Sequence, residues 1–332
     1  MHYNKFGRTG LDVSTVCLGT APFGKQTDPD VARQILDKAD DAGVNFLDTA
    51  DGYPMGSDLS LVGRTEQIVG DWLRGKRDRF IVATKAGLAM GRSPWDQGGS
   101  RKHLLDAIDG SLSRLGTDYV DLYQLHFDDP GTPLDETLEA LDTIVRTGKA
   151  RYVGVSNFLA YRLARAVGRT ETLRLSRVSS VQPRYSLLFR QIERELLPLA
   201  GEEGIAVIPF NPLAGGLLSG KYTQDVTPTE GRFSTQVGAQ FADLYNERYW
   251  HQREFDTIER LKTVAAEIGQ PLSTLSVAWV LANPGITSVI LGASRPDQLS
   301  DTLAAVDLKL DITVKATLDD ITHEYRYGDA AK

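Results

Sequence analysis

The 332-residue sequence has very little sulfur chemistry available to it, because it contains a single cysteine, Cys17. One cysteine excludes an internal disulfide and most thiolate metal sites, and it suits a reducing compartment. Cys17 lies within the apolar run STVCLGT, where we expect an inert buried side chain. The histidines show no ligand spacing either, so the sequence predicts no metal site.

Excess positive charge and long apolar runs are also missing. The net charge is −7, whereas a nucleic-acid-binding protein is expected to carry a basic face. No apolar run reaches the roughly 18 residues of a membrane span. The N-terminus, MHYNKFGRTG, has no apolar core of a signal peptide. We therefore expect a cytoplasmic protein with no nucleic-acid partner and no membrane partner.

No linker, composition shift or internal repeat divides the chain, so we interpret residues 1–332 as one domain. Apolar strand-length runs alternate with amphipathic stretches, a pattern typical of a parallel sheet covered by helices. The strand candidates are residues 14–19, 44–49, 80–85, 119–126, 150–157, 178–185, 205–211 and 286–292. The helix candidates include residues 30–42, 65–73, 101–115, 134–147, 161–167, 192–203 and 296–305. Eight such strands predict an α/β fold, a (β/α)8 TIM barrel, and residues 3–14 predict an N-terminal β-hairpin around a Gly-Arg-Thr-Gly turn.

Three predicted βα connections are longer than those of a compact barrel: residues 86–100, 127–133 and 212–254. All three follow strands, so we expect them at the mouth of the barrel. The aromatic residues Trp95, Tyr249 and Trp250 within them are candidates for the wall of a substrate pocket. The alternative is that these rings only fix the loops to the barrel rim.

Four ionisable residues stand at or just after the ends of strand candidates: Asp48, Tyr53, Lys85 and His126. In a parallel barrel these strand ends gather at one face, where catalytic groups collect. A tyrosine beside a lysine that is held by an aspartate, with a histidine nearby, is an arrangement for proton delivery. Tyrosine titrates near pH ~10, and a neighbouring ammonium favours the phenolate. Taken singly, the aspartate could cap a helix and the histidine could be a core residue.

Over nearly its whole length the sequence resembles the aldo-keto reductases. The matching segments are GLDVS, DTADGY, Thr84-Lys85, LYQLH, GVSNF, VQPRY, PLAGGLLSGKY and GASRPDQ. Several of these look closest to bacterial members related to potassium-channel β subunits and to deoxysugar ketoreductases. The resemblance implies a (β/α)8 fold, a nicotinamide cofactor bound without a Rossmann fold, and reversible hydride transfer between that cofactor and a carbonyl.

The same resemblance implies a role for each ionisable residue. Tyr53 would donate the proton in carbonyl reduction and, as phenolate, would accept it in alcohol oxidation. Lys85, held by Asp48, would lower the pKa of Tyr53. His126 would orient the carbonyl oxygen and stabilise developing charge.

The resemblance also implies a cofactor site. Ser156, Asn157 and Gln182 match positions that bind the nicotinamide carboxamide, and Phe210 stands where many relatives place an aromatic ring beneath the nicotinamide. The glycine-rich segment after it resembles a loop over the pyrophosphate. Its candidate residues are Asn211, Leu213, Gly215 and Lys221.

The GASRPDQLSDTL segment, which begins at Gly292, indicates which dinucleotide the protein binds. Ser294 and Arg295 match positions that bind the adenosine 2′-phosphate, which favours NADPH over NADH. Gln298 and Asp301 match positions that contact adenine, although Asp301-Thr302 replaces the Glu-Asn of many relatives. The alternative for Ser294 is a simple helix cap.

One departure lies beside the predicted catalytic tyrosine, where residues 53–66 run longer than in many relatives and would reshape one side of the pocket. A sugar or a hydroxylated natural product fits a pocket with long loops. The predicted function is thus an NADPH-dependent reductase whose partner is a small-molecule carbonyl or alcohol. A cofactor-bound, redox-sensing regulatory subunit with weak reductase activity is the alternative. The intact set of four ionisable residues argues against a catalytically silent barrel.

Overall fold

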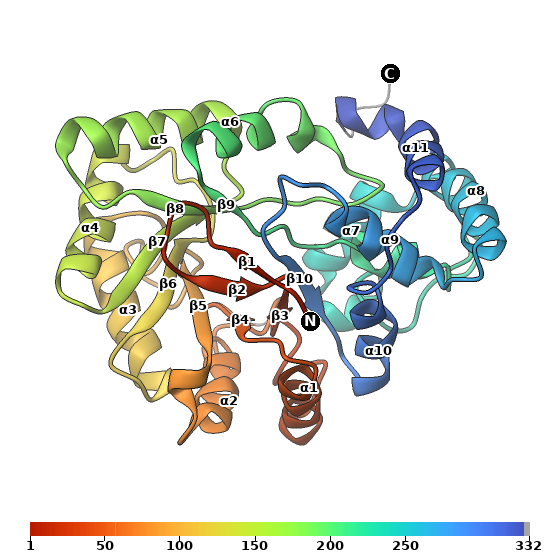
Figure 1. Cartoon of the computed structure of the whole chain (residues 1–332). Coiled ribbons are helices and arrows are strands. Elements are labelled where there is room, and N and C mark those ends of the chain that lie inside the picture. Colours follow the sequence, from red (N-terminus) through yellow and green to blue (C-terminus); the bar gives the residue numbers. More distant parts are fainter. Residues whose placement is uncertain (57, 329–332) are drawn as a thin grey trace.

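The computed structural model describes residues 1–56 and 58–328, and its centre is a sheet of eight parallel strands (Figure 1). The strands are β3 (Val16–Gly19), β4 (Phe46–Asp48), β5 (Ile81–Ala86), β6 (Val120–Leu125), β7 (Ala150–Ser156), β8 (Val178–Gln182), β9 (Ala206–Val207) and β10 (Val289–Gly292). They pair in chain order from β3 to β9, and β10 pairs with β3.

Backbone hydrogen bonds close the remaining gap between β9 and β10. The Thr287 amide donates to the Val207 carbonyl, and the Ile290 amide donates to the Pro209 carbonyl, both at 2.9 Å. The sheet therefore curls into a closed barrel, and the predicted (β/α)8 fold is confirmed. β9 is shorter than the predicted strand at 205–211, because its last residues bond irregularly to both neighbours.

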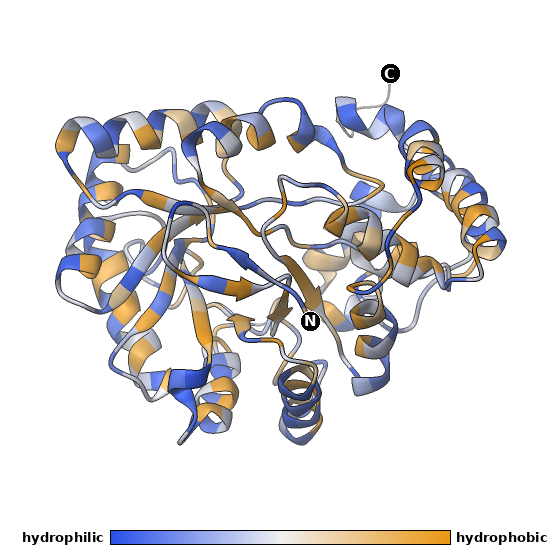
Figure 2. Ribbon diagram, in the orientation of Figure 1, coloured by the Kyte–Doolittle hydropathy of each residue, from blue (hydrophilic) through white to orange (hydrophobic). Residues whose placement is uncertain are grey.

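Helices surround the barrel on its outside (Figure 1). They are α1 (Pro29–Asp41), α2 (Arg64–Leu73), α3 (Arg101–Leu115), α4 (Leu134–Arg146), α5 (Ala160–Leu173), α6 (Leu196–Glu203), α7 (Ala239–Tyr249), α8 (Gln252–Glu267), α9 (Leu272–Leu281), α10 (Pro296–Ala304) and α11 (Ile312–Ile321). Short 3-10 helices lie at η1 (Arg77–Arg79), η2 (Gln191–Glu193), η3 (Ala214–Ser219), η4 (Thr235–Val237) and η5 (His323–Tyr327). Most carry one apolar face, as the mixture of colours in Figure 2 shows.

Some helix boundaries differ from the prediction. α5 runs well beyond the predicted 161–167, and the predicted helix at 192–203 is divided into η2 and α6. The predicted connection at 212–254 contains α7. Within the described part of the chain no single helix is long and apolar enough to cross a membrane; only α8 and α9 together, bent by 92°, pass a test of length and composition.

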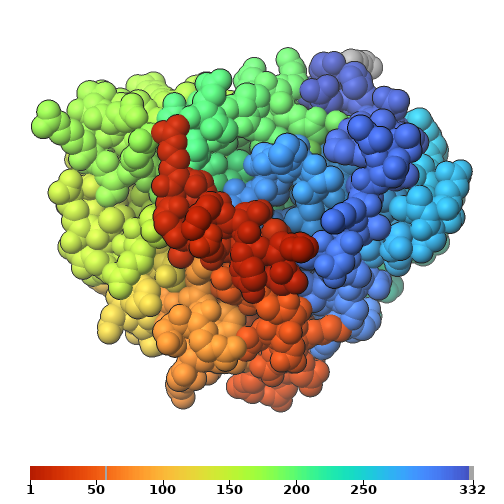
Figure 3. All heavy atoms as spheres, in the orientation of Figure 1, coloured from red at the N-terminus to blue at the C-terminus, as the bar shows by residue number. Residues whose placement is uncertain are grey.

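The predicted N-terminal hairpin is confirmed as β1 (Tyr3–Lys5) paired antiparallel with β2 (Asp12–Ser14). It lies across one face of the molecule, drawn in red in Figure 3. Phe6 and Val13 are buried in the same cluster as barrel residues, and the Phe6 ring packs edge-on against Phe46 at 5.9 Å. The hairpin therefore closes the end of the barrel at which the strands begin.

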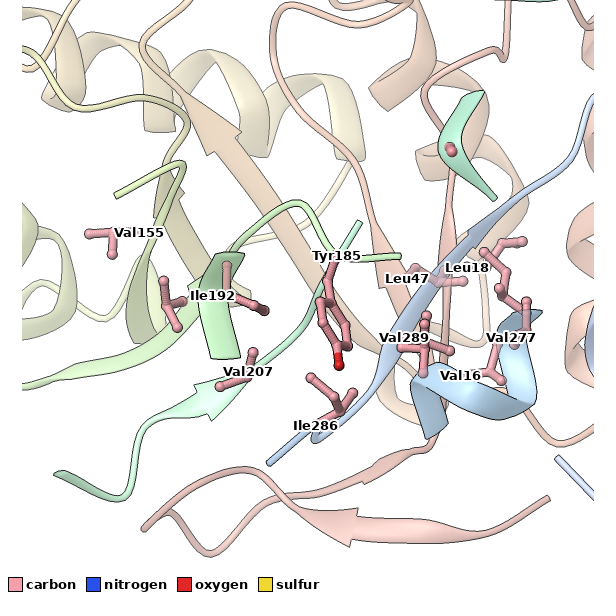
Figure 4. Packing of buried hydrophobic residues seen from close by; sticks show 14 of the residues in the cluster. Val16, Leu18, Leu47, Val155, Tyr185, Ile192, Val207, Val277, Ile286 and Val289 are labelled. Atoms are coloured by element: carbon pink, nitrogen blue, oxygen red, sulfur yellow. The ribbon is translucent and has the colours of Figure 1, made fainter. Parts of the chain in front are cut away.

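Alternation along the strands sorts the side chains between two cores. Val16, Leu18 and Leu47 belong to the larger cluster between sheet and helices (Figure 4), whereas Cys17 and Phe46 belong to the small cluster inside the barrel. Successive strand residues point to opposite faces, so the position two residues after Phe46 again faces the barrel interior. The same period brings polar side chains of several strands together at the carboxyl end of the barrel.

Candidate active site

Asp48, the last residue of β4, is held by side chains from three other strands. The buried Lys85 ammonium donates to Asp48 Oδ2 at 2.6 Å and to the Thr49 carbonyl at 2.7 Å. Asp48 Oδ1 accepts hydrogen bonds from Gln182 Nε2 at 2.9 Å and from Gln124 Nε2 at 3.3 Å. Gln124 is a site residue that the sequence reasoning missed, although its position two residues before His126 places it on the same inward face of β6.

Tyr53 lies beside this ion pair, with the Lys85 nitrogen 4.9 Å from the centroid of its ring. Burial alone would lower the pKa of Lys85, but the charge of the Asp48 carboxylate and its hydrogen bond raise that pKa, so Lys85 is an ammonium. Burial also raises the pKa of Tyr53, and the opposing effect of Lys85 is smaller. Lys85 thus lowers the pKa of Tyr53, as predicted, but desolvation exceeds the attraction of the ammonium and the net direction is upward. Tyr53 is a phenol at neutral pH and can donate a proton.

His126 follows β6 and is also buried. Its ring packs edge-on against Tyr53 at 5.6 Å and stacks on Phe127 at 4.8 Å. Burial, and secondarily the positive charge of Lys85, holds the pKa of His126 well below its usual range, so the imidazole is neutral. Its Nδ1 has no hydrogen-bond partner among the described residues. His126 also lines the cavity beside Tyr53, where a neutral imidazole can form a hydrogen bond to a ligand oxygen.

A cavity of about 400 Å³ opens above these residues at the carboxyl ends of the strands. Asp48, Tyr53 and His126 line it, and Lys85 lies beneath its floor. Every residue predicted for the cofactor also lines it: Ser156, Asn157, Gln182, Phe210, Asn211, Leu213, Gly215, Lys221, Gly292, Ser294, Arg295, Gln298 and Asp301. The structure thus gathers residues from across the sequence around one continuous space.

Ser156 and Asn157 form a fixed polar group beside His126. The Ser156 hydroxyl donates to the Gln182 carbonyl at 2.9 Å. The Asn157 amide nitrogen donates to the His126 carbonyl at 3.0 Å and to Ser156 Oγ at 3.1 Å. Asn157 has a φ of 58°, a conformation that asparagine tolerates better than most residues. These bonds orient the side chains before any ligand binds.

The far end of the cavity is positively charged. Partial burial and then the charge of Arg295 lower the pKa of Lys221, so the two cations lie within electrostatic reach of each other. Two neighbouring cations in a cavity fit a bound anion, which would offset their repulsion. Arg295 also lies 3.5 Å from the exposed Asp297 carboxylate.

Ser294 does not cap α10, so the alternative weighed for this residue is wrong. Arg295 occupies the N-cap position, and the described residues provide no side-chain cap there. The amide and hydroxyl of Ser294 instead donate to Gln298 Oε1 at 2.9 and 3.2 Å. The first backbone amides of α10 therefore have no side-chain cap competing with an anion.

The three predicted pocket aromatics do not line this cavity. Trp95 is 55% exposed on its loop. Tyr249 is fully buried and accepts a hydrogen bond from Asn211 Nδ2 at 2.9 Å, and Trp250 donates to the Gln224 carbonyl at 3.2 Å. The alternative, in which rings fix a loop to the barrel, describes Tyr249 and Trp250. The residues of this region that do line the cavity lie on α7: Phe241, Leu244, Tyr245 and Arg248.

The long run after Tyr53 contributes Met55 to the cavity wall. Its neighbour Gly56 approaches the β9–α8 connection so closely that an added Cβ would lie 1.8 Å from the Val237 carbonyl oxygen. The Lys25 ammonium donates to both the Gly56 and the Val237 carbonyls. Ser57, within the predicted departure at 53–66, lies outside the described residues. The run therefore joins two loops at one edge of the cavity.

Comparison with known proteins agrees with this geometry. A family model described as "Aldo/keto reductase family" matches residues 15–323. The chain is 39% identical to "Uncharacterized oxidoreductase YrpG" of Bacillus subtilis, over 97% of this chain and 96% of that protein. It is 36% identical to "Probable voltage-gated potassium channel subunit beta" of Arabidopsis thaliana, over 93% and 92%. It is 35% identical to "L-glyceraldehyde 3-phosphate reductase" of Escherichia coli, over 92% and 88%.

Proposed function

Because the chain belongs to the aldo/keto reductase family, we propose that it is an NADP(H)-dependent oxidoreductase that interconverts an aldehyde or ketone with its alcohol. One observation carries the proposal: the Tyr53 ring centroid lies 4.9 Å from the nitrogen of the Lys85 ammonium, which Asp48 holds at 2.6 Å. His126 stands beside the same phenol at the floor of the cavity. This arrangement supplies a proton donor and a second polar group at one point in space.

The lining residues fit a dinucleotide that runs from this floor to α10. Ser156, Asn157 and Gln182 offer hydrogen bonds to a carboxamide, and Phe210 offers a flat apolar face. When bound, the nicotinamide supplies the hydride. The paired cations Lys221 and Arg295 support NADP(H) over NAD(H), because the extra phosphate adds negative charge for them to bind.

In the reducing direction Tyr53 donates its phenol proton to the carbonyl oxygen as the carbon is reduced. The Lys85 ammonium stabilises the phenolate that remains, and Asp48 keeps that ammonium charged and in place. His126 donates a hydrogen bond to the same oxygen and fixes its position. In alcohol oxidation the Tyr53 phenolate accepts the proton.

The test follows NADPH absorbance at 340 nm with a panel of aldehydes and ketones. Turnover should fall by a factor of at least about 100 in Tyr53→Phe, because the general acid is removed. Quenching of tryptophan fluorescence by NADPH should persist in that variant, which shows that the cofactor site is intact. Tyr161→Phe, on the exposed start of α5, is the matched control and should retain turnover. Unchanged turnover in Tyr53→Phe would sink the proposed mechanism.

A redox-sensing regulatory subunit is the second candidate, favoured by the 36% identity to a probable channel β subunit. Both candidates bind the cofactor, but they differ in turnover. A sensor would oxidise one bound NADPH and release the product slowly, so it would show a single stoichiometric burst. A metabolic reductase would continue through many cycles. The cytoplasm stays our predicted location, because a single buried cysteine suits a reducing compartment.

A further inference from the structure

A second cavity lies between the first turns of α1 and α2, which are neighbours in Figure 1. Its volume is about 370 Å³, close to that of the first cavity, and Arg33 of α1 and Arg64 of α2 line it. Both helices begin where a strand has ended, so this α1–α2 cavity opens at the same end of the barrel as the active site. Its size is in the range of small-molecule sites.

Arg64 is the cation of the α1–α2 cavity that lacks an anion. Arg33 pairs with Asp30 at 2.6 Å, and the one acidic lining residue, Asp71, pairs with Arg74 at 2.9 Å. Among the described residues no hydrogen bond or ion pair engages the Arg64 guanidinium. An unbalanced cation in a concave site, on a protein of net charge −7, favours an anionic ligand.

The stem of Arg64 is held in place, so the guanidinium is presented in a set direction. A Cβ at Gly24 would lie 3.0 Å from Cδ of Arg64, so the glycine leaves room for the stem. Gln67 follows three residues later on the same side of α2, and its side-chain amide has no hydrogen bond within the described part of the chain. Leu61 and Ile68 add apolar lining.

The outer wall of this cavity belongs to the run after Tyr53, which is longer than in many relatives. Ser60, Leu61 and Val62 of that run line the cavity. The next residue, Gly63, donates its amide to the Tyr53 carbonyl at 2.9 Å. A ligand in the α1–α2 cavity therefore contacts a loop that is bonded to the backbone of the proposed proton donor.

We propose that the α1–α2 cavity is a regulatory site for the phosphate group of a small molecule, with Arg64 as its main cation. The bound ligand would hold residues 58–63 against α1, and so connect this cavity to Tyr53. A phosphate carries more charge than a carboxylate and has enough oxygens to accept bonds from Arg33 as well. The inference goes beyond the proposed function and stands without it.

The experiment titrates phenyl phosphate into NADP⁺-saturated protein in a calorimeter, so that the groups that bind the cofactor are already occupied. We expect a single site with a dissociation constant below about 1 mM. Arg64→Met should weaken binding about tenfold or more, and Arg64→Lys should restore part of the loss. Arg260→Met makes the same charge change at an exposed site on α8 and should leave the affinity unchanged. Phenylacetate, with a carboxylate in place of the phosphate, should bind more weakly.

Hydrogen exchange of the same protein reports the loop directly. Phenyl phosphate should slow the exchange of amides in residues 58–63 of the wild type, and it should have no such effect in Arg64→Met. Binding that depends on Arg64 and protects this loop supports the proposal. No binding, binding that Arg64→Met leaves unchanged, or binding without protection of the loop overturns it, and equal affinity for phenylacetate overturns the choice of phosphate. None of these measurements uses turnover, so they decide the inference whether or not the protein reduces aldehydes.

Discussion

The Lys85 ammonium lies 2.6 Å from Oδ2 of Asp48, and the two side chains are 0% and 4% exposed. A buried ion pair of this kind depends on both partners, because each charge has lost its water. Lys85→Met should therefore lower the free energy of unfolding by about 3–5 kcal/mol, since it leaves the Asp48 carboxylate buried with only neutral donors. Urea unfolding followed by circular dichroism measures the loss.

Lys102→Met is the matched control for that prediction. The Lys102 nitrogen lies 2.7 Å from Oδ2 of Asp106, about as close as in the buried pair, but the two side chains are 61% and 68% exposed. Its removal should lower the free energy of unfolding far less, because water screens an exposed ion pair. If the two variants lose similar amounts of unfolding free energy, the buried Asp48 carboxylate does not need the Lys85 ammonium for stability.

The pH profile of carbonyl reduction should be flat between about pH 6 and 9. Reduction requires the protonated phenol of Tyr53, which is present below its folded-state pKa and lost as pH rises through it. Because burial raises that pKa, the loss should lie above the ordinary tyrosine range. His126, whose pKa is held well below its usual range, should add no step near pH 6.5. The measurement is kcat/KM against pH, and a midpoint inside this interval would contradict the assigned protonation states.

Arg295→Ala should raise the KM for NADPH far more than the KM for NADH. The variant removes one of the two neighbouring cations at the α10 end of the cavity. NADPH carries a phosphate that NADH lacks, so its binding should weaken more. Initial rates with each cofactor, at a saturating carbonyl concentration, provide the comparison. Arg260→Ala on the exposed side of α8 controls for net charge. Equal small effects on both cofactors would argue against a 2′-phosphate site at Arg295.

Gly215→Ala should destabilise the protein and weaken cofactor binding. Gly215 has a φ of 73°, and a Cβ there would lie 2.6 Å from Cδ1 of Tyr245 on α7. Gly75→Ala is a close control, because Gly75 has a φ of 75° and nothing within 4 Å of its Cβ position. The control should cost about 1 kcal/mol for backbone strain alone, and Gly215→Ala should cost more. Thermal unfolding of both variants, with and without NADPH, tests the difference.

The barrel and most of its lining could be predicted from sequence because local patterns encode them. Period-two alternation puts Asp48 and Lys85 on inward faces, and the carboxyl ends of parallel strands must meet at one edge. The role of the glycine-rich segment was harder to predict. From the sequence we expected Gly215 to let the backbone approach a phosphate. The structure shows that the absence of a side chain at Gly215 also makes room for the Tyr245 ring.

Two features could not be read from the chain. The net pKa of Tyr53 depends on how completely the barrel excludes water, which no local pattern reports. The side of α7 that lines the cavity depends on which way the helix faces. Tyr249 and Trp250 are aromatic, as pocket residues often are, yet they pack away from the cavity. The spacing from Phe241 to Arg248 identifies the cavity side only once α7 is known to be a helix.

The carboxylate of Asp48 binds Lys85, Gln124 and Gln182, and so links β4 to β5, β6 and β8 across the barrel interior. Opening this floor would break contacts to four of the eight strands at once. Amide hydrogens around it should therefore exchange only when the whole barrel unfolds, while those of the segment carrying α7 can exchange through smaller openings. The polar floor beneath Tyr53 is therefore expected to be among the last parts of the barrel to open.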